Sequence, residues 1–482
     1  MYLNLFLILF QIALAFSQHS QVLVVSFDGF RYNYFDKHIT PTLDRLKLKG
    51  THAEFLRNVF ITKTYPNHHS IATGLYPESH GVVANSFYDP TLKRILKYSE
   101  EMWHYRDDIT PIWILNEKAG EGRHSGTFMW PGSDFAYQNT KPTFSVVYNT
   151  SIKWRDRVDT VVSWFQDSAT PANLVMMYFE EPDKEAHRFG ADSEAVSKQI
   201  ARVDEITSYL LQQLLENNLP VNVILLSDHG MTTVTSERII NVLHMVDNST
   251  LVAGVTPALQ LIPPADRVWT VYRLLAEHSS HYNYTVYLKK DLLDRWHFKN
   301  NERVPPIFLL ADEGYGFDDL LAFDIFEDVD IAAENRTYGA HGYDNAVSSM
   351  HPFFIAWGPR IKKNYTIEPF DTVDLYSLFC KLLDLDVPQT DGSLSNVVGM
   401  LTEGQTRTVS SLPIKIFAVV AVSLLLMGCA CCITHQILKQ DRTPASLQSY
   451  KLLDPPRIIR PKSSGNEQEE RHLLGNDDIE ES

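Results

Sequence analysis

The stretch Val22-Leu-Val-Val-Ser-Phe27, followed directly by Asp28, decides the fold. Its residues are nearly all apolar and mostly β-branched or aromatic, so the run has no polar face to turn towards water. A short strand that is apolar on both faces is typical of the centre of a parallel sheet. Two further runs have the same character and also lead into acidic residues: Leu174-Val-Met-Met-Tyr-Phe179 before Asp183, and Val221-Asn-Val-Ile-Leu-Leu226 before Asp228 and His229.

Helical patterns lie between these strands. Residues 193–217 place apolar side chains at the three- and four-residue spacing of one helix face: Val196, Ile200, Val203, Ile206, Leu210 and Leu214. Alternation of strands with helices predicts an α/β sandwich with a central, mostly parallel sheet flanked by helices. The chain of 482 residues is long enough for one large catalytic domain, which we place at residues 18–400.

Acidic residues and histidines gather where the predicted strands end. Open α/β sheets bind ligands outside the carboxyl ends of their strands. A single Asp after a strand is ordinarily a loop or cap residue, but three of them with histidines attached indicate a metal site. A mixed set of oxygen and imidazole donors without thiolate suits zinc best, with manganese or iron as alternatives. The candidate ligands are Asp28, Asp183, His187, Asp228, His229 and His341.

The run Lys63-Thr64-Tyr65-Pro66-Asn67-His68 places a hydroxyl at the head of a predicted helix, because proline suits a first helical turn. Free threonine is a poor nucleophile, but a coordinating divalent ion favours its alkoxide at neutral pH. Lys63 adds positive charge, and a helix start aims backbone amides at a phosphate. Taken alone, Thr64 is best explained as a helix cap. Beside a metal set it becomes the candidate nucleophile.

Five longer segments carry a family resemblance. They are Thr62-Lys-Thr-Tyr-Pro-Asn-His68, Thr73-Gly-Leu-Tyr-Pro-Glu-Ser-His-Gly81, Met129-Trp-Pro-Gly-Ser-Asp134, Ala311-Asp-Glu-Gly-Tyr315 and His341-Gly-Tyr-Asp-Asn345. Together they resemble the ectonucleotide pyrophosphatase/phosphodiesterase family of the alkaline phosphatase superfamily, most closely its short membrane-anchored members numbered four and five. The resemblance extends over about residues 22–388, nearly the whole predicted catalytic domain.

The resemblance implies an alkaline-phosphatase-like sandwich that holds two zinc ions. Thr64 takes the role of nucleophile, forming a covalent nucleotidyl-threonine that water then hydrolyses to a nucleoside 5′-monophosphate. One zinc has four matching ligands and the other has three: Asp28, Thr64, Asp228 and His229 for the first, and Asp183, His187 and His341 for the second.

Other positions match the family's contacts to the substrate. Asn85 corresponds to an amide donor for a non-bridging phosphate oxygen, and a neutral donor favours diesters over dianionic monoesters. Tyr65 and Tyr148 correspond to aromatic residues that clamp the nucleotide base, and we also assign Lys63 to substrate binding. Stacking of this kind contributes about 1–3 kcal/mol per base. Core packing is the alternative role for both tyrosines.

Three positions depart from the family pattern. His69 stands where relatives carry tyrosine, and Ala186 replaces the glycine before the histidine ligand, which narrows the conformations open to the backbone near His187. Cys380 is the only cysteine of the predicted ectodomain, so that domain has no internal disulfide. We therefore expect the departures to affect stability rather than chemistry.

The two ends of the chain predict a type I membrane protein of the cell surface. Residues 1–17 are typical of a signal peptide, 401–413 of a polar stalk, and 414–438 of a transmembrane helix. Lysines and arginines follow the span, so residues 439–482 are predicted to form a cytoplasmic tail. Two tail patterns, Glu469-Glu-Arg-His-Leu-Leu474 and Tyr450-Lys-Leu-Leu453, resemble clathrin-adaptor signals and predict endosomal cycling. Glycosylation sequons occur only on the predicted outer side, at Asn149, Asn248, Asn283, Asn335 and Asn364.

The net charge of −16 argues against a nucleic-acid polymer as a partner, because such partners call for a basic surface. It leaves small phosphate esters open, since two divalent cations would dominate the field at the reacting phosphorus. The leading hypothesis is a phosphodiesterase that cleaves nucleotide diesters or dinucleotides outside the cell. The alternatives are a phosphodiesterase for choline phosphodiesters or lysolipids, and a catalytically weak adhesion ectodomain.

Overall fold

The computed structural model describes residues 19–322, 336–402, 427–428 and 430–435. The chain divides into two compact units, residues 1–405 and 406–482. In the second unit the described residues, 427–428 and 430–435, are helical. None of the described helices is both long and apolar enough to cross a bilayer. The predicted signal peptide, nearly all of the stalk, most of the span and the whole tail lie outside the described residues, so these assignments stay predictions.

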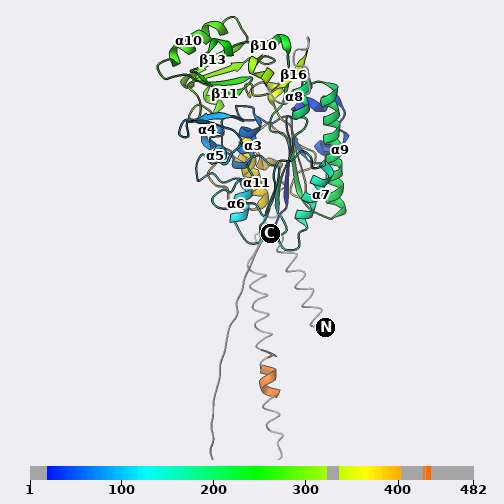
Figure 1. Ribbon diagram of the computed structural model, residues 1–482. Coiled ribbons are helices and arrows are strands. Elements are labelled where there is room, and N and C mark those ends of the chain that lie inside the picture. The colour runs from blue at the N-terminus through cyan, green and yellow to red at the C-terminus, as the bar shows by residue number, and fades with distance from the viewer. Residues whose placement is uncertain (1–18, 323–335, 403–426, 429, 436–482) are drawn as a thin grey trace, which may run out of the picture. The chain divides into compact units, whose positions relative to one another are not determined.

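An eight-stranded sheet forms the centre of the first unit, in the order β18-β2-β17-β8-β1-β7-β5-β6 (Figure 1). Neighbouring strands are parallel throughout β8-β1-β7-β5-β6, and β18 is parallel to β2. Only β17 runs against its neighbours. The sheet is therefore mostly parallel, as the sequence predicted. Its strands are β1 Val22–Phe27, β2 Thr51–Ala53, β5 Ser125–Phe128, β6 Phe144–Val146, β7 Leu174–Phe179, β8 Asn222–Leu226, β17 Phe354–Trp357 and β18 Tyr365–Ile367.

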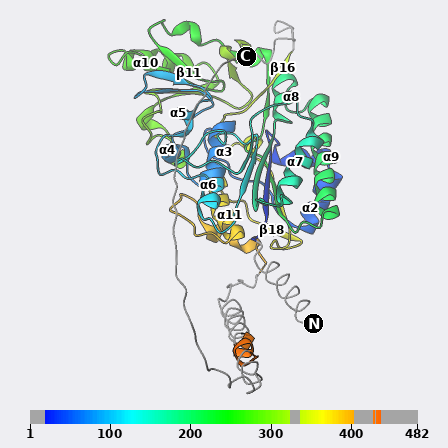
Figure 2. The same ribbon diagram turned by 60° about the horizontal axis from the view of Figure 1, so that its bottom comes forward.

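Helices cover both faces of this sheet, which confirms the sandwich (Figure 2). Helices α2, α7 and α9 lie on one face, and α3, α6 and α11 lie on the other. The prediction for residues 193–217 is confirmed by α9, whose N-cap Ser193 accepts a hydrogen bond from the backbone of Val196. The helices are α2 Pro41–Lys49, α3 Thr64–Thr73, α4 Pro77–His80, α5 Glu100–Trp103, α6 Ile112–Lys118, α7 Trp154–Phe165, α8 Asp183–Phe189, α9 Glu194–Glu216, α10 Val268–Ser279 and α11 Leu375–Leu383.

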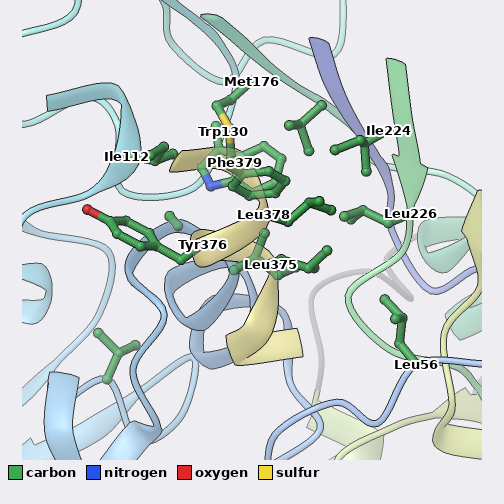
Figure 3. Close-up of a cluster of buried hydrophobic side chains, with 14 of the residues drawn as sticks. Leu56, Ile112, Trp130, Met176, Ile224, Leu226, Leu375, Tyr376, Leu378 and Phe379 are labelled. Atoms are coloured by element: carbon green, nitrogen blue, oxygen red, sulfur yellow. The ribbon is translucent and has the colours of Figure 1, made fainter. Parts of the chain in front are cut away.

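The central strands pack on both sides because alternate residues point to opposite faces. Val22 and Val24 of β1 join one apolar cluster, while Leu23 and Val25 join the other. In Figure 3, side chains of α11 such as Leu378 lie against those of the strands. All six residues of β1 are buried, so this run forms a central strand, as the sequence predicted.

A smaller antiparallel sheet, in the order β11-β12-β14-β13, packs with α10 around a third apolar cluster. The sequence predicted no separate sheet here. The strands outside the main sheet are β3 Phe87–Asp89, β4 Arg94–Leu96, β9 Thr232–Thr235, β10 Ile239–Ile240, β11 Leu251–Val255, β12 Ala258–Ile262, β13 Tyr284–Leu288, β14 Ile307–Ala311, β15 Gly316–Phe317 and β16 Thr337–Ala340.

Candidate metal centre

Three adjacent strands bring the predicted ligands together. Because β8, β1 and β7 are neighbours and parallel, their carboxyl ends meet at one edge of the sheet. Asp28 follows β1, Asp228 follows β8, and Asp183 opens α8 after β7. Backbone contacts tie these ends to one another: Gly29 N donates to Asp228 Oδ1 at 3.2 Å, and Asp183 N donates to Asp28 O at 3.1 Å.

Gly29 allows this close approach. Its φ of +68° lies in the left-handed region, which a side chain disfavours. A Cβ atom at this position would also lie 2.8 Å from the Cβ of Asp183. Glycine is therefore required both for its backbone conformation and for the space it leaves. It lets the backbone after β1 approach the start of α8 closely.

Asp28, Asp228 and His229 form the first donor group. His229 Nε2 lies 3.3 Å from Asp28 Oδ1 and 3.1 Å from Asp228 Oδ2. Thr64 Oγ1 lies 3.3 Å from the same nitrogen. A tetrahedral zinc ion with ligands at about 2.0–2.1 Å holds them about 3.3 Å apart. These spacings fit one such ion with four protein donors.

Asp183, His187 and His341 form the second donor group. His187 Nε2 lies 3.4 Å from Asp183 Oδ2, as expected for residues four apart on one helix. His341 Nε2 lies 3.6 Å from Asp183 Oδ1 and 3.1 Å from His187 Nε2. Three donors leave a fourth position for water or substrate, which is typical of catalytic zinc. The imidazoles of His229 and His341 stack at 3.6 Å, so the two groups are contiguous.

Backbone carbonyls orient all three imidazoles. Nδ1 of His187 donates to Gly339 O, Nδ1 of His229 to Gly230 O, and Nδ1 of His341 to Thr62 O, at 2.8–2.9 Å. A carbonyl can only accept, so each Nδ1 carries a proton, and the Nε2 of each ring faces its donor group. Metal-binding histidines are commonly oriented in this way.

The carboxylates also fit cations. Asp28 Oδ1, Asp183 Oδ1 and Asp228 Oδ2 are buried and accept no hydrogen bond from the described residues. Burial, with the neighbouring carboxylates of Asp228 and Asp183, raises the pKa of Asp28 well above its ordinary value. Buried, unpartnered carboxylate oxygens that repel one another are costly, and bound cations would remove that cost.

Thr64 is the first residue of α3, as predicted. The side chain of Asn67 fixes the segment leading to it, because Oδ1 accepts from Val59 N at 2.9 Å and Nδ2 donates to Lys63 O at 2.9 Å. Asn85 lies beside Thr64, since its Oδ1 accepts from Tyr65 N at 2.9 Å. A backbone N–H can only donate, so the atom that accepts from Tyr65 is the side-chain oxygen of Asn85. The Nδ2 of the same amide remains available as a donor.

The three predicted substrate contacts lie in different settings. Tyr65 is half-buried and packs at 5.4 Å against the rings of Tyr98 and Trp103. The side chain of Tyr148 is 55% exposed, and its ring lies 6.3 Å from that of Tyr178. Both tyrosines lie within electrostatic reach of Asp28, whose charge adds to burial in raising the pKa of each phenol. The base-clamping role of the pair stays a prediction.

Lys63 is buried rather than open to solvent. Its Nζ donates to Thr256 O at 2.8 Å, and burial lowers its pKa to about 8. Its Cε lies so close to Gly342 that a Cβ there would be 2.5 Å away. Lys63 thus joins the helix start to the segment after His341 and to the smaller sheet. A direct contact with substrate stays a prediction.

Sequence reasoning missed two residues that support the ligands. The hydroxyl of Tyr178 donates to Asp28 Oδ2. His68 donates from Nδ1 to Thr64 O at 2.8 Å, and its Nε2 accepts from Ser26 Oγ at 2.9 Å, so it joins α3 to β1. His68 lies in the quoted helix motif one turn after Thr64, which was the available signal. Tyr178, one of the few polar residues in an apolar strand, was the other.

The departures leave the metal centre unchanged. Ala186 lies inside α8, where a helical backbone accepts alanine readily, and it is Gly339 opposite that must lack a side chain. His69 is buried against Trp103, and burial lowers its pKa to about 3, so it is a neutral ring in the core. Cys380 is a free, buried thiol of α11, and burial raises its pKa to about 12.

This fold and site define a class of enzyme. The profile of the type I phosphodiesterase / nucleotide pyrophosphatase family matches residues 22–344, and the chain belongs to that family. It is therefore a nucleotide pyrophosphatase/phosphodiesterase, a hydrolase of phosphodiester bonds.

Particular relatives agree with this assignment. Human ectonucleotide pyrophosphatase/phosphodiesterase family member 5 is 38% identical over 399 residues, which are 81% of this chain and 80% of that protein. The bis(5′-adenosyl)-triphosphatase of Xenopus laevis is 35% identical over 452 residues, 92% of this chain and 94% of that protein. An inactive variant of murine ectonucleotide pyrophosphatase/phosphodiesterase 5 in complex with AMP has a TM-score of 0.72 at 39% identity, covering 80% of this chain and all of that one.

Proposed function

We propose that this protein hydrolyses nucleotide diesters or dinucleotides to a nucleoside 5′-monophosphate with two zinc ions and Thr64 as nucleophile. The observation that carries the proposal is the position of Thr64 Oγ1, 3.3 Å from His229 Nε2 at the first donor group. The relatives support it: one is named a bis(5′-adenosyl)-triphosphatase, and the structure of another was solved in complex with AMP as an inactive variant with threonine replaced by alanine.

Two zinc ions would lower the pKa of the Thr64 hydroxyl and neutralise charge on the phosphate. Asp28, Asp228, His229 and Thr64 would hold one ion; Asp183, His187 and His341 would hold the other. The remaining chemistry belongs to the chain. Thr64 Oγ1 forms a bond to phosphorus, the bond to the leaving group breaks, and the hydroxyl proton passes to solvent. Water then cleaves the threonine ester and releases the nucleoside 5′-monophosphate.

Asn85 would stabilise the charge that develops on the phosphate. Its oxygen is held by Tyr65 N, which fixes the amide plane and leaves Nδ2 as a donor next to the nucleophile. A preorganised donor of this kind is worth more in the transition state than in the ground state. A neutral amide suits the single charge of a diester, so we assign substrate preference to diesters.

We further propose that the catalytic domain acts outside the cell on a membrane-anchored chain. The signal-peptide pattern at residues 1–17 and the apolar run at 414–438 support this arrangement. Four sequon asparagines fall within the described residues, and all four are exposed: Asn149, Asn248, Asn283 and Asn364. Protease accessibility on intact cells and a mass shift after deglycosylation test this placement.

A substrate panel tests the proposed reaction. Purified full-length protein is given diadenosine triphosphate, nicotinamide adenine dinucleotide, nitrophenyl-thymidine monophosphate and glycerophosphocholine, with product identification. We expect a nucleoside 5′-monophosphate from the first three, loss of turnover with chelator and recovery with zinc. Turnover of glycerophosphocholine alone would support the choline alternative instead.

A further inference from the structure

A second pocket is lined by residues that are neither predicted ligands nor predicted substrate contacts. Its volume is about 410 Å³, within the range of small-molecule sites. It is built from the segment after β2, the residue before α4, the 3₁₀ turn Asp294–Trp296 with His297, and the segment after β16. The lining residues that matter are Phe55, Arg57, Asn58, Tyr76, Arg295 and His351.

Two stacked ring pairs form walls of this pocket. Phe55 and His351 stack with centroids 4.2 Å apart and ring planes 11° from parallel. Tyr76 and His297 stack at 4.1 Å and 15°. Flat aromatic surfaces of this kind bind planar rings, each stacked base contributing about 1–3 kcal/mol.

Buried polar atoms in the lining lack partners. Asn58 is 1% exposed, yet neither its Oδ1 nor its Nδ2 has a hydrogen-bond partner among the described residues. His351 is 8% exposed; its Nε2 donates to Asn345 O at 3.1 Å, which leaves Nδ1 as an acceptor without a partner. An unsatisfied buried polar group costs about 1–3 kcal/mol. An amide with a free donor and a free acceptor matches the polar edge of a purine.

Two arginines retain free donors at the same pocket. Arg57 binds Asp371 through Nε and Pro369 O through Nη1, and Arg295 binds Asp344 through Nη1 and Nη2. Arg57 Nη2 and Arg295 Nε make no hydrogen bond within the described part of the chain. Both side chains are about half exposed, at 47% and 48%. In a chain of net charge −16, this lining has two guanidinium groups and one carboxylate, Asp371.

We propose that this pocket is a second, non-catalytic site for a nucleoside monophosphate. The purine ring packs on the stacked walls, its polar edge pairs with Asn58, and its phosphate takes the free N–H groups of Arg57 and Arg295. The site needs no metal, and it does not depend on the proposed reaction.

The pocket also explains residues that the metal centre leaves unused. In the motif His341-Gly-Tyr-Asp-Asn345, only His341 belongs to a donor group. Asp344 holds Arg295, and Asn345 Nδ2 donates to Asn58 O at 2.9 Å. The end of the motif therefore shapes the second pocket.

Counting bound AMP tests the proposal. Full-length, metal-loaded protein is titrated with AMP by equilibrium dialysis, and we expect two molecules per chain. Chelator should remove the one at the metal centre and leave the one in the pocket. Asn58→Leu should remove the pocket molecule while turnover of nitrophenyl-thymidine monophosphate stays unchanged. One AMP per chain with metal and none with chelator would overturn the proposal.

Two variants separate binding from folding. Asn58→Leu removes an amide without partners, so the melting temperature should not fall. Arg57→Gln should weaken pocket binding at least about tenfold, a loss of 1.4 kcal/mol, while Arg106→Gln, at an exposed arginine paired with Asp108, should not. Unchanged pocket binding in both Asn58→Leu and Arg57→Gln would overturn the assignment.

Fragments of the ligand identify its chemistry. With chelated protein, adenosine and inorganic phosphate are each tested as competitors of AMP. We expect each to displace AMP more weakly than unlabelled AMP does, because each supplies half of the contacts. Displacement by phosphate as strong as by AMP would reduce the site to a plain anion site and overturn the nucleotide assignment.

Discussion

The Nε2 atoms of His187 and His341 lie 3.1 Å apart, although the two residues are 154 positions apart in the chain. Both Nδ1 atoms donate to backbone carbonyls, so two lone pairs face each other. Such an arrangement is repulsive in the absence of a cation. The two facing nitrogen atoms therefore indicate where a cation would bind, which neither residue indicates alone.

The first prediction concerns metal content. We expect two zinc ions per purified chain and one in His341→Ala, with turnover falling at least about 100-fold because a direct ligand is lost. Elemental analysis and rates on nitrophenyl-thymidine monophosphate measure both. His244→Ala, at an exposed histidine that forms a hydrogen bond with Asn241, serves as control. Two zinc ions and normal turnover in His341→Ala would contradict the second donor group.

Thr64→Ala should reduce kcat by about three orders of magnitude or more, because the attacking oxygen is lost. Thr64→Ser should keep a measurable fraction of the rate, since it keeps a hydroxyl at the start of α3. Zinc at the second donor group should persist in both variants. Rapid quenching followed by mass analysis should detect a nucleotidyl adduct in Thr64→Ser and none in Thr64→Ala. Wild-type turnover in Thr64→Ala would end the proposed mechanism.

Tyr178→Phe removes the hydroxyl that donates to Asp28 Oδ2. Loss of such a supporting contact typically lowers metal affinity or activity about 10–100-fold, and a chelator titration should show the weaker binding. Tyr209→Phe is the matched control, because its hydroxyl binds Asp159 on the surface. Equal metal affinity in the two variants would leave Tyr178 as a packing residue only.

Asn85→Ala should lower kcat by about 10²–10³-fold, the usual cost of one lost oxyanion donor. Because the donor acts chiefly in the transition state, KM should change far less than kcat. Steady-state kinetics on a diester separate the two parameters. A rise in KM with kcat unchanged would make Asn85 a ground-state binding residue.

The buried carboxyl of Asp319 predicts a pH-dependent gain on substitution. Burial raises its pKa to about 6, above the ordinary value of an aspartate, so its stabilising, protonated form is present at low pH and is lost as the pH rises through about 6. Asp319→Asn keeps an acceptor for Thr256 N and cannot ionise. Its melting temperature should therefore exceed that of wild type by more at pH 7.5 than at pH 5. The gain in the free energy of unfolding is at most about 3 kcal/mol. A constant difference would show that Asp319 does not titrate there.

The sequence anticipated those features that depend on neighbours in the chain. β1 and β7 have the predicted bounds, because their apolar runs stop where the acids begin. Thr64 begins a helix as expected, since helix starts have local signals. The carbonyl that orients His341 could not be predicted from the sequence, because Thr62 lies 279 residues away in the chain and any backbone carbonyl could accept this bond. The burial of Lys63 could not be predicted for the same reason: its partner, Thr256 O, belongs to a turn that no local pattern specifies.

The contact between Gly29 and Asp183 sets the spacing between the two donor groups. Position 29 carries no side chain, so the backbone after β1 approaches Asp183 closely, and an added Cβ would lie 2.8 Å from the Asp183 Cβ. Even alanine at position 29 would push Asp183 away from Asp28 and so separate the two donor groups. In such a variant each donor group would keep its residues, but two ions bound there would lie too far apart to share one phosphate.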